Sequence, residues 1–96
     1  MSNRQGMLAG QVAWITGASS GVGEGLAVAC AEAGARVVLS ARRAAELERV
    51  RARLPGTGHL VLPMDVKDLE ALPGLVEQVR GACGRLDLLV CNAGIS

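Results

Sequence analysis

Glycines and small polar residues are concentrated in residues 16–23 (TGASSGVG), between a short apolar run and an alanine-rich run. Glycine at such a junction permits backbone dihedrals that are closed to other residues and lets a ligand approach the chain closely. If the alanine-rich run is a helix, its free N–H groups and the positive end of its dipole favour a phosphate or pyrophosphate at the turn. The candidate phosphate-binding residues are Gly17, Ser19, Ser20, Gly21, Val22 and Gly23.

The residues on either side of this turn predict a strand followed by a helix. Residues 11–16 are mostly apolar and lie between Gly10 and Gly17, as expected of a strand buried on both faces of a parallel sheet. An alternative interpretation is that the glycines and serines only connect the two elements, without a ligand. After the turn, apolar residues recur at helical spacing as far as Gly34: Val22, Leu26, Ala29, Cys30 and Ala33.

The rest of the chain continues the alternation of strands and helices. Leu47, Val50 and Leu54 share one face of a predicted helix. Pro73 fits the start of another helix, and Gly84 fits its end. The four predicted strands are residues 11–16, 35–40, 59–63 and 86–91, and the helices after the first span residues 43–54 and 73–83, with a short turn over 68–72.

This βαβαβαβ order predicts an α/β fold with a Rossmann-like, doubly wound parallel sheet. The strand order expected of a dinucleotide-binding unit is 3-2-1-4, which opens a crevice at the carboxyl ends of strands 1 and 4. The glycine turn and the turn at residues 92–94 both follow strands that end there. Residues 1–96 are interpreted as one part of such a domain, incomplete at its C-terminus.

The end of the second predicted strand indicates which dinucleotide is bound. An acidic residue at this place binds the ribose hydroxyls of NAD, whereas an arginine accommodates the 2′-phosphate of NADP. Residues 40–43 (SARR) offer two guanidinium groups and no carboxylate. NADP(H) is therefore predicted over NAD, with Arg42 as the 2′-phosphate ligand; the alternative is that Arg42 and Arg43 begin a charged helix face.

Composition excludes several classes of function. The 96 residues are half hydrophobic and carry a formal charge of +1, with no basic block and no Phe or Tyr to stack on bases, which argues against nucleic-acid binding. No run has the length of a membrane span or a signal peptide, so a cytoplasmic protein is expected. Cys30, Cys83 and Cys91 form no C-x-x-C pair and are interpreted as reduced thiols, and no zinc site is expected.

The turn motif resembles that of the short-chain dehydrogenase/reductase family, whose cofactor turn is T-G-x-x-x-G-x-G. The resemblance extends to Asp65-Val66, which matches the family's adenine-contacting aspartate, and to Asn92-Ala93-Gly94, which matches its N-A-G motif beside the cofactor. Residues 40–50 are similar to the branch that acts on steroids, retinoids and other lipophilic carbonyls. From the residues alone, Asp65 can also cap a loop or helix, and Asn92 can be a turn residue.

The family resemblance implies hydride transfer between nicotinamide and a small-molecule carbonyl or alcohol. In that family a tyrosine is the acid/base, assisted by a lysine four residues later, a serine and an asparagine. This sequence contains no tyrosine, so no catalytic residue is assigned. We expect the cofactor-binding half of an NADP(H)-dependent oxidoreductase, inactive as 96 residues and a homo-oligomer only at full length; the alternative is a noncatalytic nucleotide-binding or partner-binding module.

Overall fold

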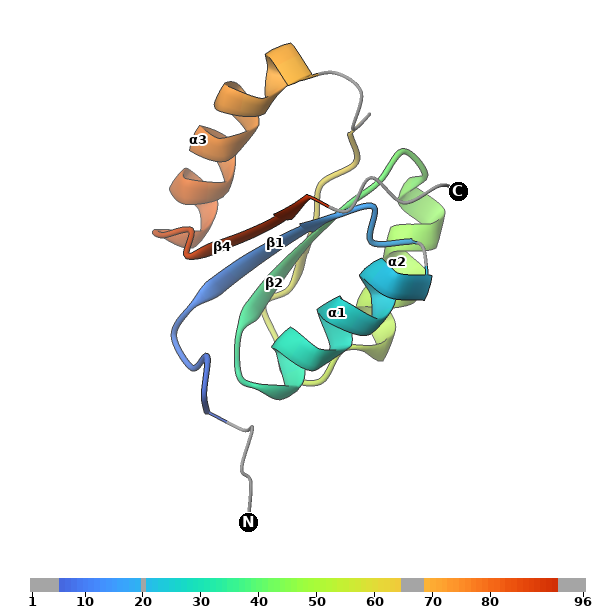
Figure 1. Cartoon of the computed structure of the whole chain (residues 1–96), viewed down its shortest axis with the longest axis vertical. Helices are drawn as coiled ribbons and strands as arrows, with labels where there is room; N and C mark the ends of the chain where they lie inside the picture. Colours follow the sequence, from blue (N-terminus) through green and yellow to red (C-terminus); the bar gives the residue numbers. More distant parts are fainter. Residues whose placement is uncertain (1–5, 20, 65–68, 92–96) are drawn as a thin grey trace.

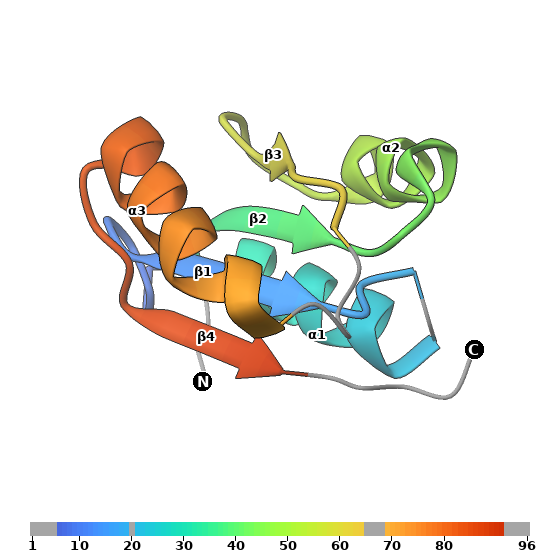
Figure 2. The same ribbon diagram turned by 90° about the horizontal axis from the view of Figure 1, so that it is seen from above.

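The fold is a four-stranded parallel sheet, seen in a computed structural model that describes residues 6–19, 21–64 and 69–91. The strands are β1 (Val12–Thr16), β2 (Arg36–Ser40), β3 (Leu60–Val61) and β4 (Leu88–Cys91). Their order across the sheet is β3-β2-β1-β4, with every neighbouring pair parallel (Figures 1 and 2). The predicted strand order and fold class are confirmed.

Helices cover both faces of this sheet. They are α1 (Gly21–Glu32), α2 (Ala44–Arg53) and α3 (Leu72–Cys83), and a 3-10 turn at Leu69–Ala71 precedes α3. Helices α1 and α2 pack on one face, and α3 packs on the other (Figures 1 and 2). Among the described residues, no helix combines the length and the apolar character needed to cross a bilayer.

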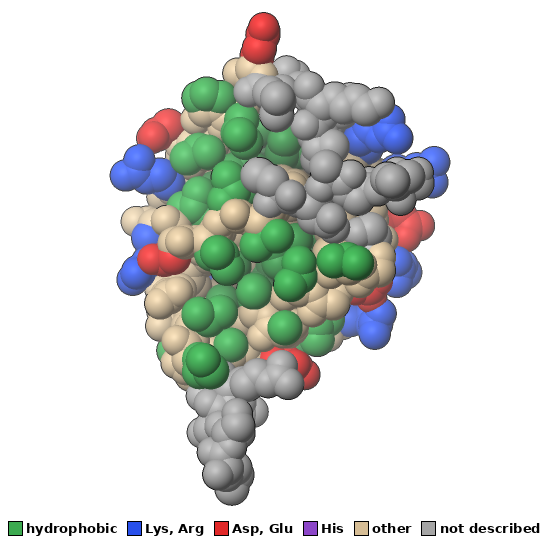
Figure 3. All heavy atoms as spheres, viewed as in Figure 1, with side chains coloured by type: hydrophobic (Ala, Val, Ile, Leu, Met, Phe, Trp, Pro, Cys, Tyr) green, Lys and Arg blue, Asp and Glu red, His purple; other side chains and the backbone are tan. Residues whose placement is uncertain are grey.

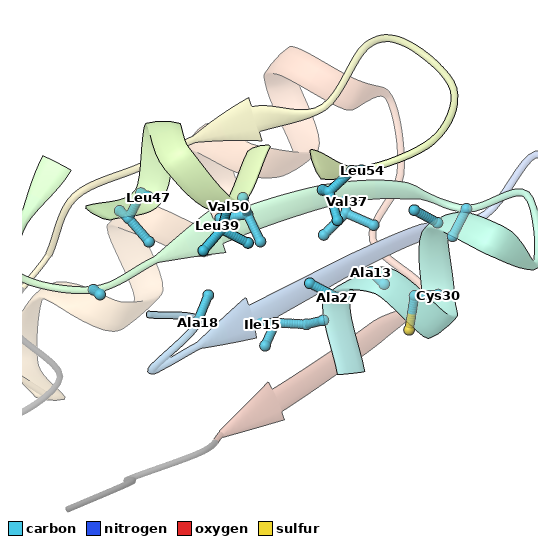
Figure 4. Close-up of a cluster of buried hydrophobic side chains, with 13 residues drawn as sticks. Ala13, Ile15, Ala18, Ala27, Cys30, Val37, Leu39, Leu47, Val50 and Leu54 are labelled. Atoms are coloured by element: carbon cyan, nitrogen blue, oxygen red, sulfur yellow. The ribbon is translucent and has the colours of Figure 1, made fainter. Parts of the chain in front are cut away.

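The core between the sheet and helices α1 and α2 is the larger of two buried clusters (Figure 4). Strands β1 and β2 contribute side chains such as Ile15 and Leu39, both fully buried. The predicted inner face of α2 is confirmed, because Leu47, Val50 and Leu54 all lie in this cluster. On the outer side of α2, Glu46 pairs with Arg49 and Glu48 with Arg51, as their i, i+3 spacing allows.

The core beneath α3 is built around the single tryptophan. Trp14 is fully buried between β1 and α3, together with Val12, Val38 and Val79. Leu75 and Val76 of α3 pack against this cluster, as predicted. The helix carries Pro73 in its first turn and ends at Gly84 in the left-handed conformation.

The buried face of α1 matches the apolar spacing at Cys30 but differs from it at Val22 and Leu26. Val22 is 69% exposed and Leu26 is 38% exposed, although both are apolar and four residues apart. The side that faces the sheet carries small residues instead: Gly23, Ala27, Cys30 and Ala31. Small side chains let α1 approach β1 closely, so close packing and not side-chain hydrophobicity sets the rotation of this helix.

Strand β3 begins one residue later than predicted, because His59 bonds to β2 through its side chain. His59 is buried, and its Nδ1 accepts a hydrogen bond of 3.0 Å from the Val37 N–H. Its Nε2 lies 2.6 Å from the Pro55 carbonyl oxygen, which identifies Nε2 as the protonated nitrogen. Regular pairing therefore begins at Leu60, and beyond the strand Leu62 still donates to the Leu39 carbonyl at 2.8 Å.

Strand β4 also begins later than predicted, because Asp87 docks it onto β1 through its side chain. The Asp87 carboxylate accepts from the Val12 N–H at 2.8 Å, and the Asp87 N–H donates to the Val12 carbonyl at 3.0 Å. These bonds join residues 75 positions apart in the chain. Among the described residues, no strand pairs with the edge of β4 that faces away from β1. Leu88 in this strand is 41% exposed. Hydrophobic side chains gather on the face of the molecule that Figure 3 shows.

The Asp87 carboxylate makes the docking of β4 sensitive to acid. Its bidentate hydrogen bonds with Arg85, and then the bond from Val12, hold its pKa below the ordinary value. A lowered pKa stabilises the fold at pH values above the unfolded-state pKa of about 3.9, and this contribution is lost as the pH falls through the folded-state pKa. We expect Asp87→Asn to lower the melting temperature at pH 7, and we expect this difference to shrink as the pH falls through the lowered pKa of Asp87.

The control for that prediction is Glu77→Gln, which removes one negative charge from an ion pair with Arg80 on the surface of α3. Thermal unfolding of the parent and both variants between pH 2 and pH 8 gives the comparison. A difference between parent and Asp87→Asn that stays constant over this range would show that the carboxylate charge does not dock β4.

Candidate functional site

The glycine turn lies between the end of β1 and the start of α1. Gly17 has φ +64°, a left-handed conformation that favours glycine. The first turn of α1 packs directly on this backbone: a Cβ at Gly23 would overlap the Gly17 carbonyl oxygen and lie 2.9 Å from the Ala18 Cα. By contrast, a Cβ at Gly21 would meet no atom within 4 Å. The helix N-terminus is therefore held tightly on the turn while the space above Gly21 stays open.

The end of β2 lies beside this turn. Ser40 is the register partner of Thr16, and its carbonyl oxygen accepts a hydrogen bond of 3.1 Å from the Ala18 N–H. Arg42 follows two residues later and is exposed. Within the described part of the chain no carboxylate pairs with Arg42 or Arg43, whereas five other arginines are paired: Arg49, Arg51, Arg53, Arg80 and Arg85.

The end of β4 lies on the other side of the turn. The Thr16 hydroxyl donates to the Val90 carbonyl at 3.2 Å, and Thr16 is the register partner of Cys91. The structure thus brings the carboxyl ends of β1, β2 and β4 to one edge of the sheet. Of the predicted site residues, Ser19 is half-buried and Val22 exposed. Six predicted site residues lie outside the described residues: Ser20, Asp65, Val66, Asn92, Ala93 and Gly94.

One pair of side chains near the site was missed in the sequence. The Trp14 Nε1–H donates to the Ser40 Oγ at 2.7 Å, and both residues are fully buried. Each residue type is unremarkable by itself, a tryptophan in one strand and a serine in the next. Only the register of β1 against β2, which the sequence does not provide, brings the indole to the hydroxyl.

Other chemistry is scarce in the described residues. They contain no group of three His, Cys, Asp or Glu side chains that could hold a metal ion. Cys30 and Cys83 are free thiols, and burial raises the pKa of Cys30, which keeps that thiol protonated. The glycine turn and Arg42, which the sequence predicts to bind phosphate, are therefore the candidate site in this part of the chain.

Comparison with known proteins agrees with this geometry. A family described as short chain dehydrogenase matches residues 11–96. A "Dehydrogenase/reductase SDR family protein 7-like" of Anopheles gambiae is 48% identical over 93% of this chain and 30% of its own length. An "11-beta-hydroxysteroid dehydrogenase A" of Sesamum indicum is 46% identical over 92% of this chain and 26% of its own length. The chain thus spans less than a third of these curated relatives.

A solved structure shows the same arrangement of elements. A metagenomic short-chain oxidoreductase in complex with NADP superposes with a TM-score of 0.78 at 39% identity, over 92% of this chain and 41% of that one. The resemblance to the steroid- and retinoid-type dehydrogenase/reductases is confirmed by the relatives of 44–48% identity. The chain belongs to the short chain dehydrogenase family.

Proposed function

We propose that this chain forms the adenosine side of an NADP(H) site in an oxidoreductase that acts on a small-molecule carbonyl or alcohol. The observation that carries the proposal is the junction of the glycine turn with the end of β2, where the exposed Arg42 has no carboxylate partner in the described residues. When bound, the nicotinamide supplies or accepts the hydride. The residues of this chain bind and orient the other end of the dinucleotide.

The glycine turn is proposed to hold the pyrophosphate. The close contact between Gly23 and Gly17 keeps the N–H groups at the start of α1 beside the turn, and the open space above Gly21 can admit a phosphate. The helix dipole adds an attraction for the negative charge. The residues assigned to this role are Gly17, Ser19, Ser20, Gly21, Val22 and Gly23.

Arg42 is proposed to bind the 2′-phosphate that distinguishes NADP from NAD. No carboxylate lies among residues 40–43. This segment therefore has no acidic side chain to accept hydrogen bonds from the ribose hydroxyls of NAD, and none to repel a phosphate. A guanidinium can donate two parallel hydrogen bonds to one phosphate, which suits it to this role. NAD is the less favoured cofactor for the same reason.

The remaining cofactor contacts are proposed from the family resemblance. The Met64 N–H donates to the Ala41 carbonyl at 2.9 Å, so the last described residue before Asp65 lies beside the residue that precedes Arg42. This proximity supports roles for Asp65 and Val66 at the adenine. The last residue of β4, Cys91, is the register partner of Thr16 at the start of the glycine turn. Asn92, Ala93 and Gly94 come next in the sequence, and we assign them to the cofactor as well.

Catalysis itself is proposed to need residues other than these 96. They contain no tyrosine, and a phenol is the family's acid/base. Residues 1–96 are therefore interpreted as the cofactor-binding part of a larger domain, inactive alone and homo-oligomeric only at full length. A cytoplasmic location is supported by Cys30 and Cys83, which are free thiols as expected in a reducing compartment.

Calorimetry with adenosine 2′,5′-bisphosphate tests the cofactor assignment. We expect Arg42→Ala to weaken binding by about 10- to 100-fold, because a charge-assisted hydrogen bond contributes roughly 1.5–3 kcal/mol. Arg43→Ala is the matched control, since it removes the same charge one residue later, and its affinity should stay near that of the parent. If the parent binds adenosine 5′-phosphate as tightly as the bisphosphate, the NADP assignment is wrong.

A further inference from the structure

The hydrogen bond between Trp14 and Ser40 lies under the proposed site without touching its surface. Trp14 is the register partner of Val38, and Thr16 is the partner of Ser40. The indole therefore reaches along β2 toward the edge of the sheet where the strands end. Its Nε1–H donates to the Ser40 Oγ at 2.7 Å, in surroundings from which water is excluded because both side chains are fully buried.

Ser40 connects three parts of the site. Its hydroxyl oxygen accepts from Trp14 in the centre of β1, and its carbonyl oxygen accepts from the Ala18 N–H in the glycine turn at 3.1 Å. Ala18 is itself fully buried, so this end of the turn is packed in place. Two residues after Ser40 the chain reaches Arg42 at the surface. The position of Ser40 thus fixes where the segment with Arg42 leaves the sheet, relative to the turn.

We propose that Trp14 and Ser40 are positioning residues that set the preference of the site for a 2′-phosphorylated adenosine; this rests on the function proposed above. A ligand with phosphates at both the 5′ and 2′ positions must meet the turn and Arg42 at the same time. The turn is braced by the packing of Gly23 on Gly17, independently of Trp14. Arg42 is exposed, so its direction depends on the strand end that Ser40 holds.

Two variants remove this one hydrogen bond from opposite sides. Ser40→Ala removes the acceptor but keeps the backbone carbonyl that receives the Ala18 N–H, and Trp14→Phe removes the donor but keeps an aromatic ring. Calorimetry on the protein at its natural length compares adenosine 2′,5′-bisphosphate with adenosine 5′-phosphate. The affinity ratio is the affinity for the bisphosphate divided by the affinity for adenosine 5′-phosphate. Each variant is expected to reduce this ratio by about fivefold, as expected for one buried hydrogen bond. The double variant should lose no more than either single one.

Val37→Ala is the control for a general loss of stability. Val37 is fully buried in the same strand but faces the other cluster, so this variant should melt at a lower temperature and keep the parent's ratio. A parent without preference for the bisphosphate would contradict the proposed function. A parent with that preference, and variants with the same ratio, would contradict only the positioning role of Trp14 and Ser40.

A measurement on the unaltered protein covers the case in which a variant does not fold. Exchange of the Trp14 indole N–H with deuterium reports the bond directly, because the hydrogen bond to the Ser40 Oγ must break before the indole proton can exchange. We expect saturation with the bisphosphate to slow this exchange several-fold more than saturation with adenosine 5′-phosphate. Equal slowing by the two ligands would overturn the proposal.

Discussion

Replacement of Gly23 by alanine is expected to lower the free energy of unfolding by about 3 kcal/mol and to abolish binding of adenosine 2′,5′-bisphosphate. The added Cβ would overlap the Gly17 carbonyl oxygen and lie 2.9 Å from the Gly17 carbonyl carbon and the Ala18 Cα. All three are backbone atoms, so no side chain can rotate to relieve the clash. The start of α1 must move away from the turn, which opens both the core and the proposed phosphate site.

Gly25→Ala provides a matched control in the same helix. A Cβ at Gly25 meets no atom within 4 Å, and alanine is favoured over glycine inside a helix by about 0.5–1 kcal/mol. This variant should therefore be slightly more stable than the parent and bind the nucleotide equally well. Urea unfolding and calorimetry measure both quantities. If Gly23→Ala behaves like Gly25→Ala, the helix does not depend on close contact with the turn.

Trp14→Ala is expected to have the second large effect, a loss of about 4 kcal/mol in the free energy of unfolding. Trp14 is fully buried and is the largest side chain in the core beneath α3. Its removal leaves a cavity between the sheet and α3, and it takes the indole donor away from the Ser40 hydroxyl. With typical domain stabilities of 5–15 kcal/mol, such a loss leaves a small unit close to unfolding.

Trp14→Phe separates the two contributions to that loss. The phenyl ring fills most of the space but cannot donate to Ser40, so we expect about 1–2 kcal/mol of destabilisation. Urea unfolding of both variants measures the difference. If Trp14→Ala costs no more than Trp14→Phe, the volume of the indole does not contribute to the packing of α3.

The sequence was sufficient for the fold because strand and helix alternation permits few arrangements. The parallel sheet and the inner face of α2 follow from apolar spacing and from the alternation of strands and helices, and the strand order is the one expected of a dinucleotide-binding unit. The rotation of α1 did not follow, because its contact with the sheet is made by small residues such as Gly23 and Ala27. The spacing of large apolar residues does not identify a helix face that packs closely on a sheet through small residues.

The predicted starts of β3 and β4 were wrong for a related reason. His59 and Asp87 each lie just before a strand and give their side chains to backbone N–H groups of the neighbouring strand. Strand propensity treats such residues only as polar flanks, since the partner is distant in sequence. The sequence is enough to nominate the residues of the candidate site, whereas the bond between Trp14 and Ser40 depends on strand register.

The bonds between β1 and β4 also bear on how this protein is made. Val12 forms a hydrogen bond with Asp87, and Thr16 forms one with Val90. These partners lie 75 and 74 residues further along the chain. At a synthesis rate of about 5–20 residues per second, the ribosome needs roughly 4–15 seconds to deliver these partners. Collapse of a chain of this size takes only about 10–100 μs. During translation, the edge of β1 that pairs with β4 therefore stays unpaired for several seconds, and a chaperone can bind it in that time.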